Sequence, residues 1–141
     1  MDMHSEHLIS HPDEFPVEIV RICRKQAPDH LYMGELAVNS EARIGVGTEV
    51  RLHMPTVDPD AKLCGRVIWL HERGDGFVLG ISFHSHSEAF RMRMLEQLCH
   101  MAAFREQVAG EGRLLSENEA AREWIRRFSK DFPEVAPVQL H

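Results

Sequence analysis

Basic residues are in deficit in this chain. Its 141 residues include 16 Lys and Arg against 22 Asp and Glu, which gives a formal net charge of −6. Nonspecific binding to nucleic acid or to an anionic membrane depends on positive charge, so we expect neither kind of partner. A small anionic ligand held by a local group of cations stays compatible with this composition.

Long apolar runs are also lacking. No stretch approaches the roughly 20 apolar residues that span a bilayer. Residues 1–7 are acidic and histidine-rich with no apolar segment after them, unlike a signal peptide. The three cysteines, Cys23, Cys64 and Cys99, form no Cys-x-x-Cys pair, which argues against disulfides and a zinc ribbon. We therefore expect a cytoplasmic protein with reduced cysteines and no direct membrane insertion.

The motifs of common catalytic sites are absent from the sequence. It holds no glycine-rich phosphate loop and no Gly-x-Ser-x-Gly nucleophile turn. Asp58 and Asp60 flank Pro59 in a loop, where they favour the end of a strand over acid–base chemistry. Ten histidines are present, but none has the spacing of a zinc site, which needs three or four rigidly held ligands. We predict neither an enzyme nor a metal site, and no cofactor.

Period-two patterns dominate the middle of the chain and predict five strands. Apolar side chains alternate with others over residues 15–24, 31–38, 46–54, 63–70 and 77–83. The connections are short and contain proline or glycine, and no helix is expected between the strands. Since parallel pairing needs long crossovers, the pattern favours an antiparallel meander or a small β-barrel.

The period changes to that of a helix after Phe83. Ser85 to Glu88 and Ser116 to Glu119 have the form of capping boxes, and each predicts the start of a helix. The first helix is expected to reach about Ala109 and the second to end before Pro133. The expected apolar stripe of the first helix consists of Phe90, Met94, Leu98, Met101 and Val108.

The apolar stripe of the second helix needs a partner. Burial of each aromatic or large aliphatic side chain is worth roughly 1.5–3 kcal/mol. The stripe either folds back on the first helix or over a barrel end, or it forms a dimer seam or a docking face for another protein. Burial of Trp124 and Phe128 within the chain would remove the anchors of the docking alternative. The candidates for protein contacts are Trp124, Ile125, Phe128 and Phe132.

Several segments, in their order and spacing, resemble the PilZ domain, the small β-barrel that serves bacteria as a receptor for cyclic di-GMP. They are residues 11–17, 33–38, 47–52, 65–69 and 79–83, and residues 119–133 resemble a helical extension found on some short PilZ proteins. The resemblance implies a mainly β fold, a small antiparallel barrel followed by two helices. It divides the chain into a flexible segment 1–13, a PilZ-like barrel with its following helix at 14–110, an extension at 111–133 and a flexible tail at 134–141.

The ligand motifs of that family are degenerate here. Aligned on the first strand, the two arginines that hold phosphates and guanine edges in the family fall on Ser10 and Glu14. Neither residue supplies a forked cation, and Glu14 adds an anion. In the second motif Asp29 and Gly34 match, but Leu31 stands in place of a serine. We therefore expect Asp29 and Gly34 to shape a strand corner rather than a ligand seat.

Arg21 offers a substitute for the missing arginines. Arg21 and Lys25 have the spacing of the missing pair and share one face of a strand, but they lie at its far end. A solvated cationic strand end is the other interpretation. If cyclic di-GMP binds, the candidate residues are Arg21, Arg24, Asp29 and Gly34.

The resemblance implies a non-enzymatic adapter in cyclic di-GMP-linked regulation of motility, pili or biofilm. Such an adapter would act through contacts with an unidentified protein of the pilus or motility machinery, or with a second copy of itself. A genuine cyclic di-GMP receptor with non-standard residues is one alternative. A structural oligomerisation module is another.

Overall fold

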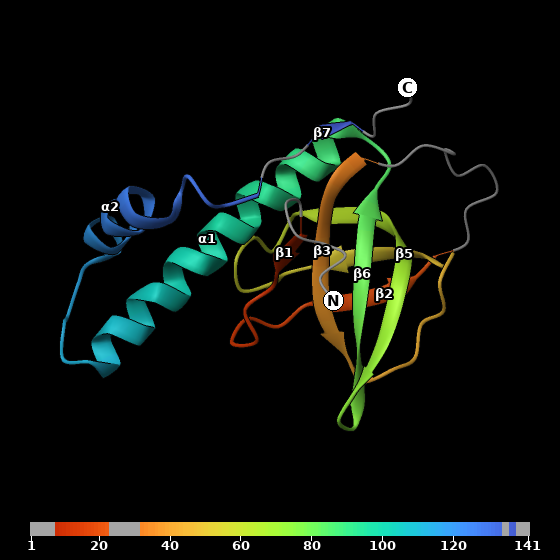
Figure 1. Ribbon diagram of the computed structural model, residues 1–141, viewed down its shortest axis with the longest axis horizontal. Helices are drawn as coiled ribbons and strands as arrows, with labels where there is room; N and C mark the ends of the chain where they lie inside the picture. Colours follow the sequence, from red (N-terminus) through yellow and green to blue (C-terminus); the bar gives the residue numbers. More distant parts are fainter. Residues whose placement is uncertain (1–7, 23–31, 134–135, 138–141) are drawn as a thin grey trace.

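The structure is a computed structural model that describes residues 8–22, 32–133 and 136–137. It confirms a mainly β chain with two helices at its C-terminal side (Figure 1). The elements are β1 (Leu8–Ser10), β2 (Glu18–Arg21), β3 (Tyr32–Ser40), β4 (Glu49–His53), β5 (Lys62–Arg73), β6 (Gly76–Phe83), α1 (His86–Gly110), α2 (Glu117–Phe128) and β7 (Ala136–Pro137).

The strands form one sheet with the order β1-β3-β6-β5-β4-β2, and β7 adds to β3. Only the β1–β3 pair is parallel. The sheet is not a simple meander, because β3 pairs with β6 and β2 pairs with β4. Within the described strands β1 and β2 end the order, so the pairings define an open sheet.

The N-terminal strands differ from those expected. Within the described part of the predicted strand 15–24, which ends at residue 22, Glu18–Arg21 forms a strand, and Phe15 and Val17 pack against the core from the segment before it. Leu8–Ser10 lies in the segment predicted to be flexible, yet it forms β1, with Ile9 buried beside β3. A strand of three residues has too short an alternation to be recognised from the sequence.

Glycines mark two local features of the sheet. The register of β3 on β6 shifts between Tyr32 and Leu36, and Gly34 lies inside this irregularity, as glycine in a strand often does. At the end of the β5–β6 hairpin Arg73 pairs with Gly76, so the loop is two residues, shorter than the gap between the predicted strands 63–70 and 77–83. Gly74, in that loop, has φ +59, which suits glycine because it has no Cβ.

Both helices begin where the sequence predicts. Ser116 and Glu119 form a complete capping box at the start of α2. At α1, the Glu88 N–H donates to Ser85 Oγ at 3.1 Å, but Glu88 Oε2 accepts instead from the Cys64 N–H of β5 at 2.8 Å. The first box is therefore half formed, and Glu88 ties the helix start to the sheet.

The apolar stripe expected on α1 is only partly buried. Phe90, Met94 and Leu98 are 47%, 44% and 53% exposed, while Val108 is buried. The helix packs on the sheet through a neighbouring row of residues that includes small side chains. Alternate residues of strands β3 to β6 form the sheet side of this contact. The buried residues of this row are Ala89, Met92, Leu95 and Cys99.

The far half of α1 projects beyond the sheet, and α2 lies alongside it (Figure 1). Phe104, Val108, Ala120, Trp124 and Phe132 extend the core into this second layer. Ala136–Pro137, in the predicted flexible tail, pairs with Tyr32 and Met33 of β3. No helix in the described ranges combines the length and apolar character needed to cross a membrane.

Candidate functional site

The positions of the degenerate nucleotide motif lie around a hollow between the N-terminal segment, the sheet and α1. Ser10 and Glu14 line this cavity of about 380 Å³ together with Asp13 and Arg73. The Ser10 carbonyl lies 2.9 Å from His100 Nε2. Two carboxylates and one guanidinium thus line the hollow. This excess of negative charge disfavours a ligand with two phosphates.

Of the alternative ligand residues the structure describes Arg21 and Gly34, and it does not bring these two together. Arg21 is exposed at the end of β2, and its Nη2 donates to the Arg43 carbonyl at 2.8 Å. Gly34 lies on β3, which β6, β5 and β4 separate from β2 along the sheet. Arg24, Asp29 and Leu31 lie outside the described residues.

The C-terminal extension packs on its own chain. Trp124 and Phe132 are buried, whereas Ile125 and Phe128 are 49% and 37% exposed. The Trp124 ring lies 5.4 Å from the Phe132 ring and 6.2 Å from the Phe128 ring, between centroids. Trp124 and Phe132 therefore anchor the extension to its own chain. Of the four residues expected to contact another protein, only Ile125 and the exposed part of Phe128 remain accessible to a partner.

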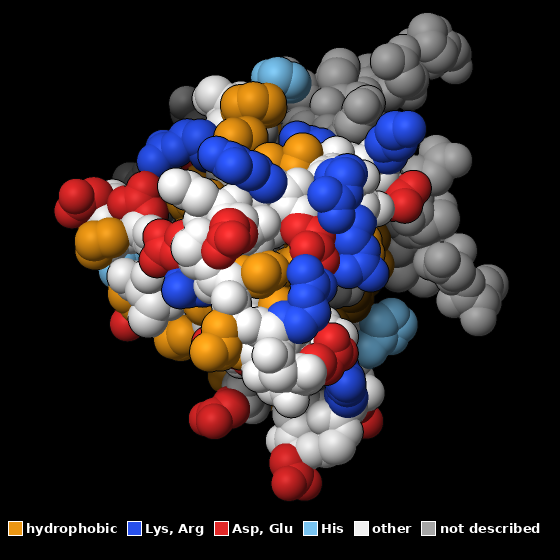
Figure 2. Space-filling model, turned by 90° about the vertical axis from the view of Figure 1, so that its left-hand side faces the viewer, with side chains coloured by type: hydrophobic (Ala, Val, Ile, Leu, Met, Phe, Trp, Pro, Cys, Tyr) orange, Lys and Arg blue, Asp and Glu red, His pale blue; other side chains and the backbone are white. Residues whose placement is uncertain are grey.

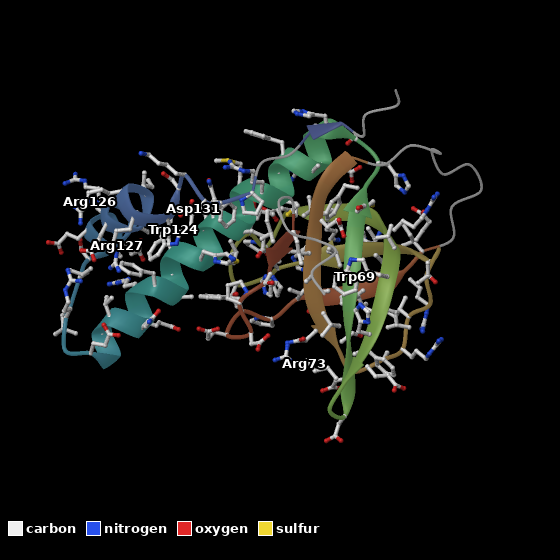
Figure 3. The ribbon with its side chains drawn as sticks, in the orientation of Figure 1. Trp69, Arg73, Trp124, Arg126, Arg127 and Asp131 are labelled. Atoms are coloured by element: carbon white, nitrogen blue, oxygen red, sulfur yellow. The ribbon has the colours of Figure 1, made fainter. Side chains whose placement is uncertain are left out.

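The outer side of the two helices carries charges of both signs. Figure 2 shows Lys and Arg side chains among Asp and Glu side chains on the face that the helices present. Arg126 and Arg127 point away from the sheet on α2 (Figure 3). Arg127 lies 5.1 Å from the Phe128 ring centroid, and its Nη1 donates to Glu123 Oε2 at 3.2 Å. Hydrogen bonds from Arg113 bring the pKa of Glu123 down to about 2.

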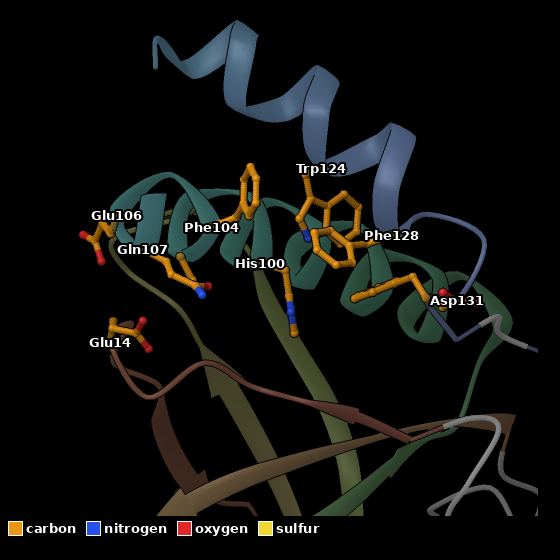
Figure 4. A pocket seen from close by; sticks show the side chains of 10 residues that line it. Glu14, His100, Phe104, Glu106, Gln107, Trp124, Phe128 and Asp131 are labelled. Atoms are coloured by element: carbon orange, nitrogen blue, oxygen red, sulfur yellow. The ribbon is translucent and has the colours of Figure 1, made fainter. Parts of the chain in front are cut away.

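A cavity of about 740 Å³ lies between α1, the extension and Glu14. The rings of Phe104, Trp124 and Phe128 lie between the two helices, and His100 points toward the N-terminal segment (Figure 4). Its charged lining groups are all carboxylates among the described residues, namely Glu14, Glu106 and Asp131. An apolar cavity with an acidic rim does not suit an anionic nucleotide.

A row of exposed apolar side chains follows α1. Phe90, Met94 and Leu98 are spaced by four residues, so they lie on one face of the helix. The His86 ring stacks on the Phe90 ring at 6.3 Å between centroids. We call Phe90, Met94 and Leu98 the α1 row. The sequence showed its periodicity but not its exposure, because the residues that cover the sheet have the same helical period.

One buried group joins segments far apart in the sequence. His11 Nδ1 lies 2.6 Å from Glu96 Oε2, and His11 Nε2–H donates to the Phe15 carbonyl at 2.5 Å. Burial alone would lower the pKa of His11, but the hydrogen bond and charge of Glu96 outweigh it and raise the pKa. Burial also raises the pKa of the neighbouring Cys99 thiol to about 12.

Sequence reasoning missed this group because 85 residues separate His11 from Glu96. It had assigned His11 to a flexible segment and had predicted no metal site anywhere in the chain. The Glu96-x-x-Cys99 spacing on a helix was the only local signal, and it carries little information without the third residue.

No family model, curated protein or solved structure matched the chain.

Proposed function

We propose that this chain is a non-enzymatic, cytoplasmic adapter of the PilZ type, in cyclic di-GMP-linked control of motility, pili or biofilm. In this proposal residues 14–110 correspond to the PilZ-like barrel with its helix, with the described strands left open between β1 and β2, and residues 111–133 extend it. The antiparallel core of the sheet and its two following helices support this assignment. The adapter acts by binding a protein of the pilus or motility machinery.

The exposed α1 row is the observation that carries the proposal. Three large apolar side chains, 44–53% exposed, form a continuous stripe on one helix. Burial of a large apolar side chain is worth roughly 1.5–3 kcal/mol, so a partner that covers the row gains substantially. Contiguous apolar stripes on a helix are typical of surfaces that bind another protein.

The charges around the degenerate motif support an adapter over a nucleotide receptor. Ser10 and Glu14 lie where the family has phosphate-binding arginines, Asp13 adds a second carboxylate, and Arg73 is the one Lys or Arg that lines the same hollow in the described chain. Each hydrogen bond from a charged donor is worth about 1.5–3 kcal/mol. Loss of two arginines therefore weakens nucleotide binding by about a hundredfold to ten-thousandfold.

Calorimetric titration with cyclic di-GMP at moderate salt tests the nucleotide question. We expect no saturable binding tighter than about 10 µM, which corresponds to about −7 kcal/mol. Tighter binding that is lost in Arg21→Ala or Arg24→Ala would establish the receptor alternative and overturn the proposal.

Pairwise binding to purified cytoplasmic components of type IV pilus and flagellar machines tests the adapter function. We expect at least one component to bind the wild type and to lose binding with Leu98→Ser. Leu114→Ser is the matched control, because Leu114 is 86% exposed and lies outside the row. Sedimentation of the free chain tests whether the row pairs two copies instead. A concentration-dependent dimer abolished by Leu98→Ser would replace the adapter with the oligomerisation module.

A further inference from the structure

The buried group of His11, Glu96 and Cys99 brings three different metal-ligating side chains together. Their ligand atoms lie within 4.8 Å of one another. Glu96 and Cys99 are one helical turn apart on α1, and His11 lies in the segment that follows β1. We propose that these three residues, named here the His11 cluster, bind a Zn²⁺ ion that fastens the N-terminal segment to α1.

The chemistry of the donor set fits zinc. Zn²⁺ accepts imidazole nitrogen, thiolate sulfur and carboxylate oxygen in a tetrahedral shell, and mixed sets of these donors occur in its sites. Softer thiolate ligands disfavour Mg²⁺ and Ca²⁺, which prefer oxygen alone. Three protein ligands leave one position of the shell for a water molecule or another small donor.

The orientation of His11 is that of a supported metal ligand. Its Nε2–H donates to the Phe15 carbonyl at 2.5 Å, and this bond directs Nδ1 toward Glu96. Histidines that bind metals usually donate their second ring N–H to a carbonyl or carboxylate, which fixes the ring and its tautomer. The Phe15 carbonyl therefore supplies the outer support that a zinc ligand needs.

Glu96 provides an independent observation. Glu96 is 0% exposed, and its Oε1 atom is buried without a hydrogen-bond partner in the described chain, with His100 Nε2 at 3.9 Å, beyond hydrogen-bond distance. Buried polar atoms nearly always have a partner, so an orphaned carboxylate oxygen requires an explanation. A Zn²⁺ ion within the cluster satisfies this carboxylate, which the ring of His11 alone does not.

An ion can reach the cluster from the surface hollow described above. His11 lines this cavity of about 380 Å³ together with His100. Of the three ligands His11 alone lines this cavity, so an ion entering from it meets the imidazole first. Without metal, the same three residues make a buried His11–Glu96 ion pair beside a thiol, which is the competing explanation.

Cobalt spectroscopy on the full chain, stripped of metal with EDTA, tests the proposal directly. Co²⁺ replaces Zn²⁺ in tetrahedral sites and reports a bound thiolate by a sulfur-to-cobalt charge-transfer absorption. We expect this absorption to saturate at one Co²⁺ per chain and to disappear when one equivalent of Zn²⁺ is added. Absence of stoichiometric binding in the wild type would leave the ion pair as the only role of the cluster.

Variants identify the ligands. Outer-sphere partners of a metal site each contribute about 10- to 100-fold in affinity, so loss of a ligand should lower Zn²⁺ affinity by at least about a hundredfold. We expect this loss in Cys99→Ser and Glu96→Gln, measured by competition with a chromophoric chelator. Circular dichroism of each variant checks that the fold persists.

The matched controls separate the cluster from other metal-binding groups of the chain. Cys64→Ser and Cys23→Ser each remove a thiol outside the cluster, and His4→Gln with His7→Gln removes the histidines of the first seven residues. Affinity and the cobalt absorption should be unchanged in these controls. Loss of binding in the His4/His7 variant, or full affinity in Cys99→Ser, would overturn the proposal.

Discussion

The indole of Trp69 on β5 reaches across β6 to Glu35 on β3. Its Nε1–H donates to Glu35 Oε1 at 2.8 Å. Gly80, the β6 residue that pairs with Trp69, leaves room for the ring to lie over the strand. The contact joins three strands of the sheet beside the irregular part of β3.

Gly80→Ala is expected to destabilise the fold. A Cβ at this position would overlap the indole ring, so Trp69 must move and lose its bond to Glu35. Overpacking of this kind costs about 1–3 kcal/mol in the free energy of unfolding. Urea denaturation measures the loss. Gly45→Ala is the control, because a Cβ there meets no atom within 4 Å and stability should not fall.

Two neighbouring positions on α2 should respond very differently to truncation. Trp124 is 4% exposed between Phe128 and Phe132, so Trp124→Ala should cost about 3–5 kcal/mol in the free energy of unfolding. Ile125 is 49% exposed, and Ile125→Ala should change the free energy of unfolding by less than about 0.5 kcal/mol. Equal losses in urea denaturation would contradict the packing of the extension on α1.

The sequence predicts the local structure of this protein better than its contacts. The helix starts at Ser85 and Ser116 were recognisable because capping uses residues only three positions apart. The β5–β6 hairpin was recognisable for the same reason, since its turn glycines lie between two alternating segments that are adjacent in the sequence. The pairing of β3 with β6 and the parallel pairing of β1 depend on contacts between distant segments, which periodicity does not encode.

The candidate sites were predicted only in part, for a related reason. A helical period identifies an apolar stripe but does not say which of two such stripes meets the sheet. The small side chains of Ala89 and Cys99 allow α1 to approach the sheet with their stripe rather than with the α1 row. Trp124 was identified as an anchor, but whether it anchors a partner or its own chain depends on Phe104 and Phe132 being near. The His11 cluster needs the tertiary fold to exist.

Arg113→Gln should raise the pKa of Glu123 from about 2 toward its ordinary value of 4.5. Arg113 donates to both Glu123 oxygens, at 2.7 and 2.9 Å, and these bonds favour the carboxylate. Because the folded pKa is depressed, the stabilising effect is complete above about pH 4.5 and is lost as the pH falls toward 2. Titration of the side-chain carboxyl carbons by NMR measures the shift. Lys130→Gln is the control and should leave this pKa unchanged.

Glu49→Ala on β4 should destabilise the fold. Glu49 is 8% exposed, with Oε2 accepting from Arg66 Nε at 2.7 Å and Oε1 lying 2.8 Å from His84 Nε2. Removal of one partner from a buried charged group leaves the other uncompensated and costs about 3–5 kcal/mol in the free energy of unfolding. Arg51→Ala, at an exposed position of the same strand, should cost less than about 0.5 kcal/mol. If both variants unfold at the same urea concentration as the wild type, Glu49 contributes no more to stability than a surface residue. The contacts of Glu49 with Arg66 and His84 then do not hold β4 beside β5 and the start of α1.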